Sequence, residues 1–75
     1  MARYTCLEDW EKSGEKYCNY FHNGLEFRFA RRADGDFDLQ SKLGTQLIDG
    51  KYVPVYETID YGPLEYCWYT MLRVS

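Results

Sequence analysis

The sequence predicts an α+β fold in which one short N-terminal helix packs on a twisted antiparallel β-sheet of four or five strands joined as hairpins. Three observations predict it: a helix start signal near the N-terminus, an Asn-Gly pair between two β-rich segments, and an Asp-Gly turn spaced to continue the sheet. With 75 residues, we expect a single domain over residues 1–75, near the size at which one hydrophobic core just suffices.

The N-terminal segment carries the signals of a helix over about residues 6–13. Thr5-Cys6-Leu7-Glu8 matches a capping box, in which the Thr5 side chain and the Glu8 side chain each bind the backbone N–H of the other residue. Gly14 can adopt the left-handed conformation that ends many helices. We expect Trp10 to anchor this helix on the rest of the molecule.

The first hairpin is predicted from Asn23-Gly24, because a type I′ turn needs positive φ at both central residues and Asn-Gly tolerates it. A two-residue turn also sets the strand register. On the side expected to face the core, the pairs are Cys18 with Phe29, Tyr20 with Phe27, and His22 with Leu25. On the other side they are Tyr17 with Ala30, Asn19 with Arg28, and Phe21 with Glu26.

The second hairpin turns within residues 32–36. A three-residue loop that ends in a left-handed Gly35 sets Phe29 opposite Leu39, whereas a two-residue loop would set Phe29 opposite a polar residue. The longer loop keeps the apolar side continuous and is therefore preferred. Residues 40–50 could form a short helix or a strand; we favour a strand or an irregular crossing, which Asp49-Gly50 closes.

The last third of the chain is rich in β-branched and aromatic residues. Two runs, 52–59 and 64–74, are predicted as strands joined by a turn at residues 60–63. Their expected core side carries Val53, Val55, Ile59, Leu64, Tyr66, Trp68 and Leu72, and the other side carries Tyr56, Cys67, Tyr69 and Met71. Pro54 cannot donate a ladder hydrogen bond, so its strand is expected at a sheet edge or at a bulge.

Aromatic residues make up 19% of the chain, more than one short helix and one sheet side can readily bury. The presumed outer side carries six large side chains: Tyr17, Phe21, Tyr52, Tyr56, Tyr69 and Met71. Two interpretations follow. The sheet curls toward a small barrel and buries them, or they form an interface with a protein partner or a second copy of the chain. The leading functional hypothesis is a non-catalytic protein-binding module that uses these six residues.

A catalytic or metal-binding role is not predicted, and no cofactor is expected. His22 is the only histidine, and in the hairpin it lies about 13 Å along the strand from Cys18, too far for a thiol–imidazole pair. Cys6, Cys18, Cys67 and His22 contain no short Cys-x-x-Cys spacing of the kind found in zinc sites, and the predicted pairing sends Cys67 to the side opposite Cys18.

The alternative hypothesis is single-stranded nucleic-acid binding through Arg28, Arg31 and Arg32, which neighbour Phe27 and Phe29. A formal net charge of −3 and strand alternation, which separates Arg28 from the Phe side, weigh against it, so nucleic acid is not the expected partner. Neither a signal peptide nor a membrane span is predicted, and three cysteines without a framework pattern favour a cytoplasmic location. Small chains of this kind are typical of proteins with which phages and mobile elements inhibit a host protein by covering its surface.

Overall fold

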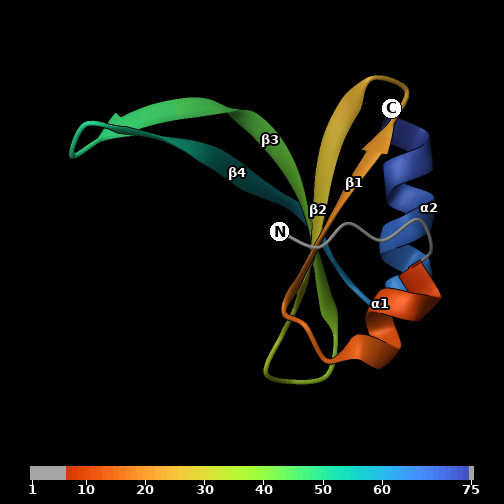
Figure 1. Ribbon diagram of the computed structural model, residues 1–75. Coiled ribbons are helices and arrows are strands. Elements are labelled where there is room, and N and C mark those ends of the chain that lie inside the picture. The colour runs from red at the N-terminus through yellow and green to blue at the C-terminus, as the bar shows by residue number, and fades with distance from the viewer. Residues whose placement is uncertain (1–6, 75) are drawn as a thin grey trace.

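The computed structural model describes residues 7–74, in which two helices lie on one side of a four-stranded antiparallel sheet (Figure 1). The elements along the chain are α1 (Leu7–Ser13), β1 (Tyr17–His22), β2 (Leu25–Arg31), β3 (Phe37–Ile48), β4 (Lys51–Gly62) and α2 (Leu64–Val74). The strands pair in the order β1-β2-β3-β4, so each strand lies beside its neighbour in sequence. The α+β class is confirmed. Because the sheet is open, with β1 and β4 as edges, the predicted alternative of a barrel-like closure is wrong.

The tight turns set the register as predicted. Asn23 and Gly24 have φ values of 51° and 76°, and Asp49 and Gly50 repeat this geometry with 50° and 77°. Gly35 has a φ of 92°, as the left-handed end of the second turn requires. The predicted pairs of the first two hairpins are confirmed, including Cys18 with Phe29, Tyr20 with Phe27, and Phe29 with Leu39.

Helix α1 begins and ends close to the predicted bounds. Gly14 follows the helix with a φ of 81°, which confirms its role as the stop. The Thr5 cap and Cys6 lie outside the described residues. Arg31 on β2 holds the C-terminal end of α1: its guanidinium donates to the backbone oxygens of Trp10 at 2.7 Å, Glu11 at 2.6 Å and Glu15 at 2.7 Å. A cation at this position satisfies orphan carbonyls and complements the helix dipole.

The C-terminal segment corrects the sequence prediction, because residues 64–74 form helix α2 and not a strand. Pro63 stands where a helix starts readily, and its carbonyl accepts the Cys67 N–H at 3.1 Å. Glu65 lies in the first turn and Arg73 in the last, as the helix dipole favours. The residues predicted as a loop, Asp60 to Gly62, instead extend β4 and pair with the start of β3. Tertiary packing outweighed the strand propensity of the Tyr, Trp and Thr residues here.

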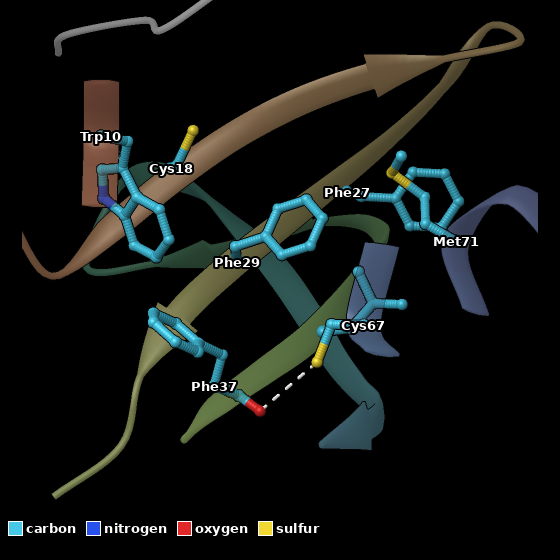
Figure 2. Close-up of a cluster of buried hydrophobic side chains, with 8 residues drawn as sticks. Trp10, Cys18, Phe27, Phe29, Phe37, Cys67 and Met71 are labelled. Atoms are coloured by element: carbon cyan, nitrogen blue, oxygen red, sulfur yellow. Dashed lines mark hydrogen bonds between the residues drawn. The ribbon is translucent and has the colours of Figure 1, made fainter. Parts of the chain in front are cut away.

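Both helices pack on the same side of the sheet, and the core lies between them and the strands (Figure 2). It consists of Trp10, Cys18, Phe27, Phe29, Phe37, Leu39, Cys67 and Met71. The helical turn reverses the predicted sides of the C-terminal segment, so Cys67 and Met71 are fully buried while Tyr66 and Leu72 are exposed. Cys67 therefore shares the core with Cys18, and the predicted placement on opposite sides is wrong. Its thiol donates to the Phe37 carbonyl at 3.5 Å.

Helix α2 is also fastened to β4 by polar contacts. The Thr70 hydroxyl donates to Asp60 Oδ2 at 2.7 Å, and the Tyr61 backbone N–H donates to Asp60 Oδ1 at 2.8 Å. Led by the Thr70 hydrogen bond, these contacts hold the pKa of Asp60 below its usual value. Arg73 donates to the Thr70 hydroxyl at 3.0 Å, which completes the group.

Candidate functional site

The outer half of the β3–β4 hairpin projects from the body of the molecule, and we call residues 43–55 the arm. Figure 1 shows it leaving the sheet on the side away from α1 and α2. A register shift between Lys42 and Gly44 marks its base. Every residue of the arm is exposed except the half-buried Val55. The exposed fraction reaches 64% for Leu43, 59% for Leu47 and 77% for Tyr52, so large apolar side chains lie in water here.

One side of the arm continues the outer face of the sheet, which is the side that carries no helix. Tyr56, Pro54 and Tyr52 alternate along β4 and therefore share this side. The register pairs Thr45 with Pro54 and Leu47 with Tyr52, which adds two residues of β3. The outer face and this side of the arm form one surface from the sheet to the tip of the hairpin.

A cleft of about 270 Å³ lies where the arm meets the outer face. It is lined by Glu15, Lys16, Tyr17, Asn19, Arg28, Pro54 and Tyr56. The Arg28 guanidinium carbon lies 4.3 Å from the Tyr17 ring centroid and 3.8 Å from the Tyr56 ring centroid. Stacking on two aromatic rings holds this guanidinium in place with its charge partly desolvated.

A polar network fixes Tyr56 beside the cleft. Its hydroxyl donates to Glu26 Oε2 at 2.7 Å and accepts the Asn19 side-chain N–H at 2.8 Å. Asn19 also donates to Glu26 at 3.0 Å, and Lys42 lies 3.7 Å from the other carboxylate oxygen. Burial, followed by the neighbouring Glu26 carboxylate, raises the pKa of the Tyr56 phenol. The ring that stacks on Arg28 is therefore held at its hydroxyl end as well.

The structure places the six predicted binding residues in four different locations. Tyr17, Phe21 and Tyr56 lie on the outer face, with Phe21 48% exposed and Tyr56 half-buried. Tyr52 lies on the arm. Tyr69 is 53% exposed, but it lies on α2 in the other layer of the molecule, so the predicted placement beside Tyr56 is wrong. Met71 is fully buried in the core, and its predicted position on an outer side is wrong.

Sequence reasoning missed part of the arm. Leu43, Leu47, Ile48 and Val53 are exposed on a hairpin that no helix covers. The signal for them was present: apolar residues flank the Asp49-Gly50 turn on both strands and occupy both sides of each strand. A hairpin of this pattern has no purely polar face to turn toward water.

The three predicted nucleic-acid-binding arginines do not form one basic surface. Arg31 contacts the end of α1, as described above. Arg32 donates to Asp34 at 3.3 Å and to Asp38 at 2.9 Å, and it stacks on Tyr61 with 4.8 Å between guanidinium carbon and ring centroid. Only Arg28 lies at the cleft. Each arginine thus has a separate intramolecular setting.

The cysteine and histidine residues of the described range, 7–74, were considered as metal ligands and as nucleophiles from the sequence. No group of three or more His, Cys, Asp or Glu residues in this range could hold a metal ion. Cys18 is fully buried on β1, the strand that ends at His22. Burial raises the pKa of the Cys67 thiol to about 11, so this group is protonated near neutral pH.

No helix within residues 7–74 is long and apolar enough to cross a membrane. Comparisons of the chain with protein-family models, with curated proteins and with solved structures found no match.

Proposed function

We propose that this protein is a non-catalytic protein-binding module that binds through the arm and the outer face of its sheet. The observation that carries the proposal is the projecting arm, with Leu43, Leu47 and Tyr52 each more than half exposed. Burying one side chain of this kind is worth roughly 1.5–3 kcal/mol. A soluble chain that leaves several of them in water on one projecting hairpin has a surface typical of protein interfaces.

The construction of the arm supports the same proposal. An isolated two-stranded hairpin is marginally stable in water, and neither of the two helices within residues 7–74 packs on the arm. Its Tyr, Leu and Pro residues present rigid apolar surface, and a stacked Arg28 stands at its base. Aromatic and arginine side chains are the residues that most often carry binding energy. By covering a functional surface of its partner, a module of this kind would act as an inhibitor.

Nucleic-acid binding is less well supported than protein binding. Of the three arginines predicted for it, Arg31 and Arg32 make the intramolecular contacts described above. Phe27 and Phe29, the aromatic residues predicted to stack on bases, are buried in the core. Neither the charge nor the aromatic platform needed for backbone-tracking binding is therefore available on this strand.

Affinity capture with a paired set of variants tests the proposal. Immobilised wild-type protein and the arm variant Leu47→Ser/Tyr52→Ser are each incubated with a cell lysate, and the captured proteins are quantified by mass spectrometry. We expect the arm variant to lose a specific protein that the wild type retains. The captured protein is then purified, and its direct binding is measured by calorimetry.

The matched control is Tyr69→Ser, which removes an aromatic side chain that is 53% exposed from α2. This variant should capture the same protein as the wild type. Equal capture by the arm variant and the wild type, with both folded by circular dichroism, would contradict the proposal. Loss of capture on Tyr69→Ser alone would move the interface to the helical side of the molecule.

A further inference from the structure

We infer that the surface formed by the arm and the cleft binds a second copy of this chain, with the Asp49 tip of each arm seated in the Arg28 cleft of the other. The inference rests on the proposed protein-binding function and names one partner for it. Within the described residues, the chain carries both halves of a complementary contact and cannot join them within one molecule, because Asp49 lies at the far end of the arm from the cleft.

The cleft supplies an unpaired positive charge. Within residues 7–74, Arg28 makes no ion pair, and its one side-chain hydrogen bond runs from Nε to Gln40 Oε1 at 2.6 Å. Its terminal N–H groups are left to bind an anionic group, and a guanidinium fixed between two rings suits a carboxylate. Glu26 is compensated by Lys42, and the remaining charges of the cleft, Glu15 and Lys16, are of opposite sign.

The size of the cleft favours a side chain over a larger ligand. Its volume of about 270 Å³ lies below the roughly 300–1,000 Å³ of pockets that hold drug-sized molecules. One or two side chains fit such a volume. Its walls are Tyr17, Tyr56 and Pro54, so the occupant should be a carboxylate that is flanked by apolar residues.

The arm tip has this composition. Asp49 is exposed in the type I′ turn, and it makes no ion pair or side-chain hydrogen bond with another described residue. Leu47 and Ile48 precede it and Tyr52 follows it closely, all of them exposed. The tip also carries Lys51, which pairs with Ile48 and lies on the opposite side of the hairpin from Leu47 and Tyr52. The side with Leu47 and Tyr52 complements the cleft in polarity, and Asp49 complements Arg28 in charge.

In a two-fold symmetric dimer, the contact between the arm tip of one copy and the cleft of the other forms twice. When two arms pack antiparallel through the sides that carry Thr45, Leu47, Tyr52 and Pro54, the tip of each meets the base of the other. The arm spans about 20 Å at about 3.3 Å per residue, and both tip-to-base distances are equal by symmetry. A standard interface covers about 800 Å² per partner, which is a minor share of the 5165 Å² surface of the chain.

Pro54 directs the contact to the face of the arm instead of its edge. In a two-residue hairpin the residues beside the turn form a hydrogen-bonded pair, so alternation places Pro54 at a position whose nitrogen points to the open edge of β4. Proline has no N–H to offer there, which disfavours addition of another strand to the β4 edge of the arm. At this edge, packing through side chains is therefore favoured over strand pairing.

Sedimentation equilibrium of the full chain tests the inference between about 5 and 500 µM. We expect a monomer–dimer equilibrium whose dissociation constant rises at least about 10-fold in Arg28→Glu and in Asp49→Lys, since each reversal places like charges in both contacts. An equimolar mixture of these two variants should form a heterodimer, because each introduced charge then meets its opposite. Native mass spectrometry distinguishes the heterodimer by mass.

The variant Asp49→Asn distinguishes a loss of dimerisation caused by the missing charge from one caused by misfolding. Asparagine is at least as well suited as aspartate to the first position of a type I′ turn, so this variant keeps the fold while it removes the charge. It should weaken the dimer, with an unchanged circular dichroism spectrum. A dimer that is insensitive to Arg28→Glu, Asp49→Lys and Asp49→Asn would overturn the inference, as would a wild-type monomer at 500 µM.

The outcomes also separate this inference from the proposed function. If the wild type is monomeric but Leu47→Ser/Tyr52→Ser still loses a captured protein, the second copy is excluded and the protein-binding function stands. If the wild type is monomeric and the arm variant captures the same proteins as the wild type, both proposals fall.

Discussion

The two halves of strand β3 both carry large apolar residues, but these residues lie in opposite environments. In the first half, Phe37 and Leu39 alternate with polar residues and are buried beneath α1 and α2. In the second half, Leu43, Leu47 and Ile48 are at least 46% exposed, because neither helix extends over the arm. An apolar strand pattern thus indicates which residues need cover, and the reach of the helices decides which of them receive it within one chain.

The largest loss of stability should follow the removal of a buried aromatic side chain beside the first half of β3, where Phe29 of β2 pairs with Leu39. Phe29→Ala removes a fully buried side chain and should lower the free energy of unfolding by about 3–5 kcal/mol, an amount comparable with the total stability of so small a domain. Urea denaturation followed by circular dichroism measures the loss. A change below about 1 kcal/mol would mean that the core collapses around the gap and that burial here carries little energy.

The connection between α1 and the sheet can be removed separately. Arg31→Gln deletes the donors to the carbonyls of Trp10, Glu11 and Glu15, and we expect a loss of about 1–3 kcal/mol in urea denaturation. Arg32→Gln is the matched control one residue along, since its partners are the carboxylates of the exposed Asp34 and the half-buried Asp38 and not helix carbonyls. The loss for Arg32→Gln should be the smaller one, and the reverse order would show that α1 is not held by this guanidinium.

The contact between α2 and β4 should make the stability depend on pH in the acid range. The pKa of Asp60 in the folded state is below its unfolded value, so this carboxyl group binds fewer protons in the folded state than in the unfolded state. Its ionised form therefore stabilises the fold at pH values above the unfolded pKa. This contribution is lost as the pH falls through the folded pKa. Urea midpoints measured from about pH 6 down to about pH 3 should fall less steeply for Asp60→Asn than for the wild type. Equal slopes would rule out a stabilising role for the Thr70–Asp60 contact.

The smallest change in stability is expected on the arm. Leu47→Ser/Tyr52→Ser alters two exposed side chains and should change the free energy of unfolding of the dilute monomer by no more than about 0.5 kcal/mol. Thermal unfolding at low micromolar concentration measures it. If these substitutions destabilise the monomer as much as Phe29→Ala does, the arm is part of the core, and the contrast between the halves of β3 disappears.

The parts of the fold that short-range geometry decides could be predicted from the sequence. Asn23-Gly24 and Gly35 require positive φ, so the first two hairpins and their registers could be derived residue by residue. The apolar side of those strands then identified Phe27, Phe29 and Leu39 as core. These inferences need no knowledge of which other element packs on the sheet.

The C-terminal segment could not be predicted correctly, because its residues fit both a strand and a helical periodicity. Tyr66, Trp68 and Thr70 favour a strand by propensity, yet Leu64, Cys67, Trp68 and Met71 follow helical spacing behind Pro63. Choosing the strand exchanged the buried and exposed sides, and so Met71 was placed in the candidate site. The cleft at Arg28 could not be predicted from the sequence either, since it depends on the bend of the hairpin that brings Pro54 beside Tyr17.

Helix α2 has a consequence for how the chain is made. Met71, which packs against the ring cluster of β2 and β3, is synthesised forty residues after Arg31, the end of β2. At about 5–20 residues per second, roughly 2–8 s separate the synthesis of β2 from that of Met71, and Phe27 and Phe29 have no helix α2 to cover them during this time. Nascent chains halted before α2 should therefore recruit holdase chaperones, and chains released after it should not.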